Sequence, residues 1–245
     1  MYYYQRTIKS GDVIEIETYR SIRKRDKRGV GRSVRLSRTS EKQKAQNDLR
    51  AKKKCQRLIL NNFVPGDMYL TLSSFTDMSE DEFRREVRNF LRRVSYYRKK
   101  QEMSELKYIG CVECGKEGKR WHGHIVINKI SFEAVSELWR CGRIFSEALY
   151  SDGGFKDLAS YIRKDVTGKK RLLQSRNLVP PEEKVVEIGK RTMRKYENGE
   201  VPRIPEGYYL HFVERSVNDE TGMTATFTLL PLRINHRTKS PRTDE

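Results

Sequence analysis

Residues 121–127, which read Trp-His-Gly-His-Ile-Val-Ile, constrain the fold of this chain more than any other segment. The apolar run predicts a buried β-strand. Because side chains alternate between the two faces of a strand, His122 and His124 should share one face, with Gly123 and Ile125 on the other. The segment therefore predicts a sheet with two neighbouring imidazoles on one face.

Two imidazoles leave a divalent metal ion short of ligands, so a third donor is needed. Glu113 ends the strand that precedes the histidines, and a hairpin would return it beside His122. A carboxylate oxygen suits Mg²⁺ or Mn²⁺, which are the ions we expect here. The alternative is that Glu113 only pairs with Lys116 or Lys119 in the turn.

The cysteines suggest a rival metal site. Cys111 and Cys114 precede the two histidines, and two cysteines with two histidines can hold structural zinc. The two cysteines differ in strand parity, however, so they should face opposite sides of the sheet. We therefore expect small buried cysteines in a reducing compartment, without a disulfide framework.

A second informative segment contains Tyr161 and Lys164, about 35 residues after the histidines. Their spacing puts them one helical turn apart. Tyr161 lies about 120° from the centre of the apolar stripe of the predicted helix, which is not where a core tyrosine would lie. Its hydroxyl can attack a phosphate covalently. Lys164 would lower the pKa of that hydroxyl, whereas Asp157 and Asp165 oppose this effect. The alternative is a surface tyrosine without a role.

The chain is strongly basic, with a formal net charge of +18. Residues 1–62 hold 18 Lys and Arg against 6 Asp and Glu, so +12 of this charge lies in the first quarter. Such an excess favours a polyanionic partner, because binding releases phosphate counterions. A basic loop with few apolar residues supplies the candidate DNA-binding residues Arg23, Lys24, Arg25, Lys27, Arg28, Arg32 and Arg35. The alternative is a solvated loop without specific contacts. No apolar stretch of roughly 18 residues suggests a membrane span.

Four segments together resemble a known family, the rolling-circle replication initiators of the HUH endonuclease superfamily. They are residues 68–75, which resemble the family's first strand motif, Trp121–Ile127 with its two histidines, 161–164 with the tyrosine and lysine of a YxxK motif, and 175–181. Their order resembles the initiators of single-stranded DNA phages and related plasmids, since relaxases usually place the tyrosine before the histidines.

This resemblance implies a function for the candidate residues. A metal held by His122, His124 and Glu113 would orient a phosphate of single-stranded origin DNA, and Tyr161 would attack it with help from Lys164. The products would be a 5′-phosphotyrosyl link and a free 3′-hydroxyl. A host polymerase would extend this hydroxyl in the bacterial cytoplasm. A host helicase would unwind the origin duplex, since no GxxxxGK[ST] phosphate loop is present.

Two other function classes fit part of this pattern. An RRM-like module could bind nucleic acid without catalysis, using stacking and charge. Such a binder has no need for two histidines, a carboxylate and a tyrosine outside the apolar stripe. A single-tyrosine transposase would use the same chemistry, but those proteins are usually shorter and lack the long basic N-terminal arm.

The pattern of elements predicts an α+β fold. We expect an antiparallel sheet of about five strands with packed helices, and the resemblance implies a ferredoxin-like (RRM-like) HUH endonuclease core. Three parts are expected along the chain: a basic strand, loop and helix over 1–62, the core over 63–180, and a C-terminal extension over 181–245. That extension should hold a polar helix over 182–199 and a β-hairpin.

Overall fold

The computed structural model describes residues 1–24, 41–115, 120–149, 172–218 and 222–232, and of 41–44 only the backbone. The chain divides into two compact units. One is Arg32–Pro181, and the other combines Met1–Gly31 with Glu182–Glu245. Within the described residues, no helix is long and apolar enough to cross a membrane.

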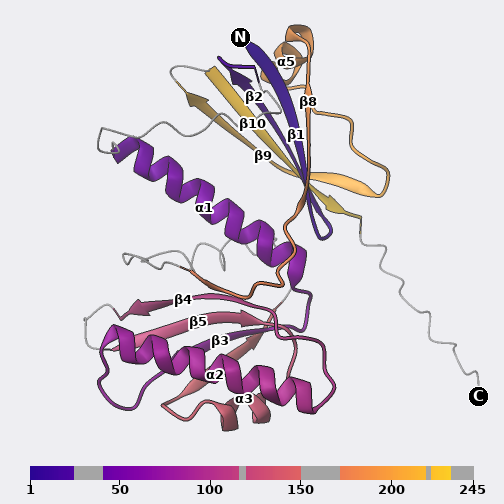
Figure 1. Cartoon of the computed structure of the whole chain (residues 1–245). Helices are drawn as coiled ribbons and strands as arrows, with labels where there is room; N and C mark the ends of the chain where they lie inside the picture. Colours follow the sequence, from indigo (N-terminus) through magenta and orange to yellow (C-terminus); the bar gives the residue numbers. More distant parts are fainter. Residues whose placement is uncertain (25–40, 116–119, 150–171, 219–221, 233–245) are drawn as a thin grey trace, which may run out of the picture. The chain divides into compact units, whose positions relative to one another are not determined.

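The unit Arg32–Pro181 contains a five-stranded antiparallel sheet with the strand order β6-β3-β5-β4-β7 (Figure 1). After helix α1, its elements are β3, α2, β4, β5, α3, β6 and β7; the bounds, from α1 on, are Glu41–Asn62, Met68–Ser73, Glu80–Lys100, Tyr108–Cys114, Trp121–Ile127, Phe132–Leu138, Ile144–Ala148 and Leu173–Gln174. The succession β3-α2-β4-β5-α3-β6, with β3 between β6 and β5, is a ferredoxin-like arrangement. The predicted α+β class is confirmed.

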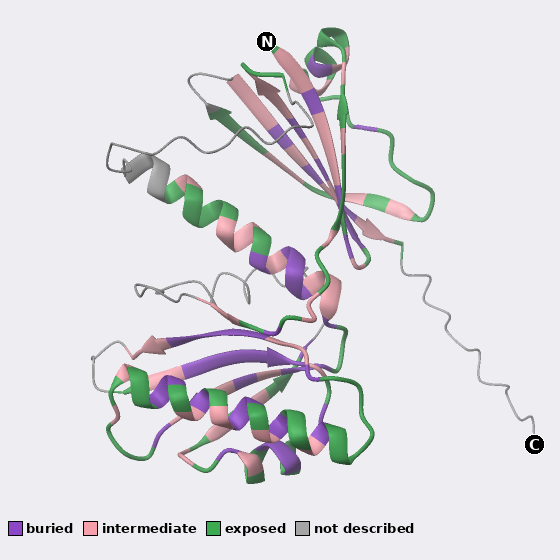
Figure 2. Ribbon diagram, in the orientation of Figure 1, coloured by how far each residue is buried: buried purple, intermediate pink, exposed green. Residues whose placement is uncertain are grey.

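Helix α2 begins and packs as its sequence dictates. Ser79 caps the helix: its hydroxyl accepts a hydrogen bond from the backbone N–H of Glu82, whose carboxylate accepts one from the N–H of Ser79. The side of α2 that faces the sheet is the buried one in Figure 2. Its buried apolar residues are Phe83, Val87, Phe90, Leu91 and Val94. This stripe fixes which face of the sheet the helix covers.

The two faces of this sheet carry different layers. Helices α2 and α3 cover one face, where Leu70, Leu72 and Ile125 are buried. The opposite face packs against the second half of α1, through a cluster that includes Ile59 and Val126. The first half of α1 has no buried residue among those whose side chains are described (Figure 2). The alternation of the strands thus leaves the α1 face partly free for other roles.

The second unit contains its own five-stranded sheet, with the strand order β8-β1-β2-β10-β9. Its elements β1, β2, β8, α5, β9 and β10 span Tyr2–Ser10, Val13–Ser21, Glu182–Glu187, Lys190–Glu197, Tyr208–Asn218 and Gly222–Pro231. Gly11, with φ of 57°, supplies the positive φ that the two-residue turn between β1 and β2 requires. Phe227 is fully buried and packs against Tyr196 of α5. This unit therefore has its own small core.

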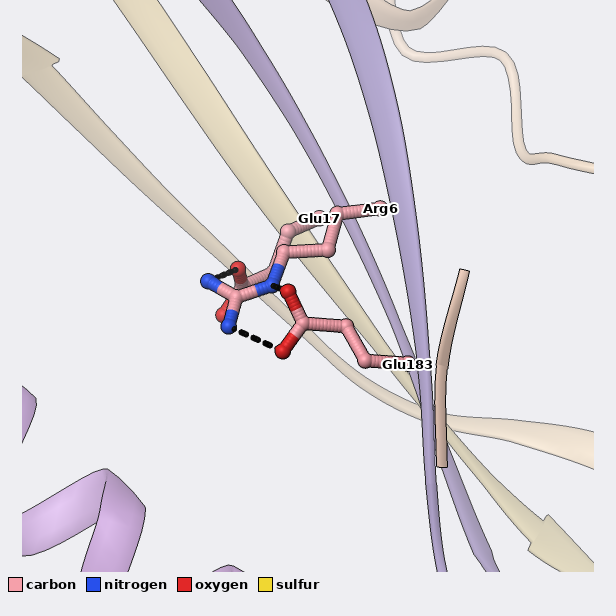
Figure 3. A network of polar contacts seen from close by, with 3 residues as sticks. All are labelled: Arg6, Glu17 and Glu183. Atoms are coloured by element: carbon pink, nitrogen blue, oxygen red, sulfur yellow. Dashed lines mark hydrogen bonds and ion pairs between the residues drawn. The ribbon is translucent and has the colours of Figure 1, made fainter. Parts of the chain in front are cut away.

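An ion-pair network ties three strands of this second sheet together. The Arg6 guanidinium on β1 donates to the carboxylates of Glu17 on β2 and Glu183 on β8 (Figure 3). The Arg6–Glu183 contact is 2.7 Å and the Arg6–Glu17 contact is 3.4 Å. All three side chains are partly exposed, so the network contributes mainly to strand register and little to stability.

The structure divides the chain differently from the expected boundaries at residues 62 and 180. Strands β1 and β2 pair with β8 and β10 from the C-terminal part, whereas α1 packs on the sheet of the other unit. The expected helix over 182–199 is wrong in its first part: Glu182–Glu187 forms strand β8, and only Lys190–Glu197 is helical. The edge of β1 accepts this segment as a strand, so tertiary pairing overrides a composition that suited a helix.

Candidate active site

The two histidines lie on the α1 face of the ferredoxin-like sheet, as their alternation predicted. Strand register aligns them with residues of β3 and β4 in two rows. The rows contain Ser73, His122 and Glu113 in one, and Thr71, His124 and Cys111 in the other. The hairpin of β4 and β5 therefore brings Glu113 opposite His122. Both histidines and the carboxylate lie on one face within a single hairpin.

His124 is the buried centre of this group, with 3% of its surface exposed. Its Nε2 lies 2.9 Å from Oε1 of Glu113. On the other side of the ring, Nδ1 lies 2.9 Å from the Tyr69 hydroxyl and 3.4 Å from Oγ1 of Thr71. Burial, with a smaller contribution from His122, lowers the pKa of His124 to about 4. His124 is therefore a neutral imidazole near pH 7, the form that can bind a metal.

The Tyr69 hydroxyl is suited to either tautomer of His124. It can donate a hydrogen bond to Nδ1, in which case Nε2–H donates to Glu113. It can also accept one from Nδ1–H, which leaves the lone pair of Nε2 facing Glu113. In the second arrangement two acceptor atoms face each other at 2.9 Å, so a cation between them is stabilised. Tyr69 thus positions His124 as outer-shell groups do in metal sites.

The donor set and its spacing fit a hard divalent ion. Ligand atoms about 2.0–2.1 Å from an octahedral ion, and at right angles, lie about 2.9 Å from each other. This matches the contact between Glu113 and His124. The His122 ring lies 6.4 Å from the His124 ring, centroid to centroid, and is only partly buried. Among the described residues no three such side chains already converge as a metal site, so His122 must turn its ring to complete one.

The four residues of the rival zinc site do not converge. Cys111 is fully buried on the α1 face, where it packs with Ile109 and Val126. Cys114 lies opposite Trp121, at a position of the other strand parity. Cys111 is therefore a packing residue, as its small apolar side chain allows.

Tyr161 and Lys164 lie outside the described residues, but the chain on both sides of them is described. Leu149 is buried in the cluster on the α1 face, and its N–H donates to the carbonyl oxygen of Asp67. Leu172 packs against the same cluster. The stretch that carries Tyr161 therefore leaves and rejoins the sheet on the face that bears the histidines.

Of the candidate DNA-binding residues, Arg23 and Lys24 are described and both are exposed just after β2. Arg25, Lys27, Arg28, Arg32 and Arg35 lie outside the described residues.

Sequence reasoning missed Tyr69. Its signal was present in the alternation of β3, where Leu70 and Leu72 are buried on the α2 face and Tyr69 and Thr71 take the opposite face. Which residue of β5 would face Tyr69 could not be read from this pattern, because the register between the two strands was unknown.

Comparison with known proteins agrees with this geometry. Residues 67–166 match the family model of the replication-associated protein ORF2, a span that begins just before β3 and includes both histidines and Tyr161. The match supports the resemblance to Rep-like replication initiators, and with it a role in DNA replication. No curated protein and no solved structure matches the chain.

Proposed function

We propose that the protein nicks single-stranded origin DNA to start rolling-circle replication, and that Tyr161 is the nucleophile. The observation that carries this proposal is the row of Glu113 and His122 beside buried, neutral His124, within a segment that matches a replication-associated family. A non-catalytic binder does not need a carboxylate and two imidazoles on the same face.

In the proposed reaction the hydroxyl oxygen of Tyr161 bonds to the scissile phosphorus and loses its proton. The bond from phosphorus to the 3′ oxygen breaks, and that oxygen takes up a proton. This leaves a 5′-phosphotyrosyl ester and a 3′-hydroxyl, which a host polymerase could extend after a host helicase has unwound the duplex. The ester keeps the energy of the broken bond, so rejoining needs no ATP.

Glu113, His122 and His124 would hold Mg²⁺ or Mn²⁺, which neutralises charge on the phosphate when bound. Tyr69 would keep the lone pair of His124 Nε2 directed at the ion. Lys164 would add positive charge near the phosphate oxygens as negative charge develops on them.

The direct test is adduct formation. The full chain is incubated with a pool of single-stranded oligonucleotides and Mn²⁺, denatured, and examined on a gel. We expect a protein band shifted by covalently attached DNA. If no adduct forms with any single-stranded DNA while the protein still binds it, the protein is a binding module and the proposed chemistry is wrong.

Replacing Glu113 with glutamine tests the third ligand. The amide keeps the shape but loses the charge, so we expect Mn²⁺ affinity to fall at least about tenfold, as measured by calorimetric titration. Thermal unfolding should change little. Glu147→Gln is the matched control, because Glu147 is an exposed carboxylate on β6, opposite Tyr69. Equal Mn²⁺ affinity in the wild type and the Glu113 variant would exclude this carboxylate as a ligand.

Replacing Arg25, Lys27 and Arg28 with glutamine tests the basic arm, which we propose holds duplex next to the nicking site. The log–log salt dependence of duplex binding should flatten by about 0.9 for each phosphate that the variant no longer neutralises. Cleavage of a short single strand should change much less. The control replaces Arg88, Arg92 and Lys99, which are exposed on α2. An unaltered salt slope in the arm variant would identify the arm as a solvated loop.

A further inference from the structure

An exposed aromatic side chain lies on the same face as the histidines. Phe145 of β6 is 59% exposed, although phenylalanine is usually buried. Its neighbour Ile144 packs into the core on the α2 side. Because strand residues alternate between faces, Phe145 takes the α1 face of the sheet.

Strand register places Phe145 in line with the candidate metal ligands. Phe145 pairs with Thr71 of β3, and Thr71 pairs with His124 of β5. Neighbouring strands lie about 4.8 Å apart, so the backbones at Phe145 and His124 are separated by about 10 Å. This is close enough for one strand of nucleic acid to touch both positions.

The charges along β6 give this surface a direction. Arg143 is exposed and precedes β6, and its carbonyl oxygen accepts a hydrogen bond of 2.9 Å from the N–H of Ser73. Two residues before Phe145, it takes the same face, beside the row that contains His122. Glu147 lies at the opposite end of β6. A phosphate is therefore attracted to the Arg143 end, which is the end nearer His122 and Glu113.

Gly142 makes this close approach of Arg143 possible. A Cβ at position 142 would overlap the carbonyl oxygen of Ser73. The chain before β6 can therefore lie directly against the end of β3 only with glycine there, and Arg143 is held next to Ser73 as a result.

We propose that Phe145 and Arg143 form a binding edge for the single-stranded DNA substrate, in which a base stacks on the Phe145 ring and an adjacent backbone phosphate contacts Arg143. The inference rests on the proposed function for the identity of the ligand. Stacking on an exposed ring suits single strands, because their bases are free and each has a π-face. Arg143 supplies the complementary charge. Together the two side chains would lead the strand from the β6 edge towards His122.

The experiment measures binding by full-length protein in EDTA, where no metal-dependent cleavage interferes. The probes are a short fluorescein-labelled single strand of mixed sequence and the same strand with abasic sites in place of its bases. The variants are Phe145→Ala, Phe145→Trp and Arg143→Gln. The matched control is Phe132→Ala, because Phe132 is 45% exposed and begins α3, which packs on the opposite face of the sheet.

Phe145→Ala should bind the normal strand about 5- to 100-fold more weakly and the abasic strand as the wild type does. Phe145→Trp should restore binding, and Phe132→Ala should leave it unchanged. Arg143→Gln should weaken binding to both probes and reduce the salt slope by about 0.7, since the glutamine no longer neutralises a phosphate while base stacking persists.

The inference is overturned if Phe145→Ala binds the normal strand like the wild type, or loses affinity equally for both probes. It is also overturned if light scattering of the DNA-free protein shows that Phe145 joins two copies of the chain and that Phe145→Ala separates them. These results are independent of nicking. Base-dependent binding without any covalent adduct would contradict the proposed chemistry alone, and an adduct formed normally by Phe145→Ala would contradict only the stacking edge.

Discussion

Replacing Tyr161 with phenylalanine should abolish the covalent protein–DNA adduct, while binding of single-stranded DNA stays within about twofold of the wild type. Only the hydroxyl oxygen is removed, and that oxygen forms the bond to phosphorus in the proposed reaction. The aromatic ring stays, so contacts made through it persist. The measurement is a denaturing gel of protein incubated with labelled oligonucleotide and Mn²⁺, together with fluorescence anisotropy for binding.

Tyr96→Phe is the control for this variant, because Tyr96 is 72% exposed on α2 and loses the same atom. It should form the adduct at the wild-type rate. If Tyr161→Phe still formed the adduct, the nucleophile would be another tyrosine, and Tyr150 would be the next to test.

Replacing His122 or His124 with alanine should reduce the rate of metal-dependent adduct formation by about a thousandfold. Losing the metal removes several kcal/mol of charge stabilisation, and about 1.4 kcal/mol corresponds to a factor of ten in rate. EDTA should have the same effect on the wild type. The measurement is the initial rate of adduct formation as a function of Mn²⁺ concentration.

The two histidine variants differ in their expected effect on the fold. His124 is buried and contacts Tyr69 and Glu113, so its removal leaves these groups without that hydrogen-bond partner and should lower the free energy of unfolding by about 1–3 kcal/mol. His122 is more exposed and should change stability less. His211→Ala, at an exposed histidine of β9, is the control for both. Adduct formation by the wild type in excess chelator would contradict a role for metal.

Tyr69 and Phe145 illustrate why the site needed the structure. Each is one residue in an alternating strand, and alternation alone assigns it to a face. What each faces depends on how β3 pairs with β5 and β6, and a shift of one residue in that pairing would change every partner. The contact of Tyr69 with His124 and the line from Phe145 to His124 are therefore consequences of register.

The sequence by itself determined the features that depend on neighbours along the chain. Residues two apart on one strand share a face, so His122 and His124 had to lie together. The capping box at Ser79 and Glu82 began α2 where expected, and the short hairpin brought Glu113 to His122. Each of these rests on local geometry that no distant segment can easily change.

Only the tertiary structure decided which distant segments pair. Strands β1 and β2 form a sheet with β8 and β10, although more than 150 residues separate them along the chain. Their alternating patterns suit many partners almost equally well, so the choice depends on the packing of the whole unit. The same reason explains why Glu182–Glu187 became a strand: β1 offered an edge and Arg6 offered a charge to Glu183, neither of which is visible in the segment itself.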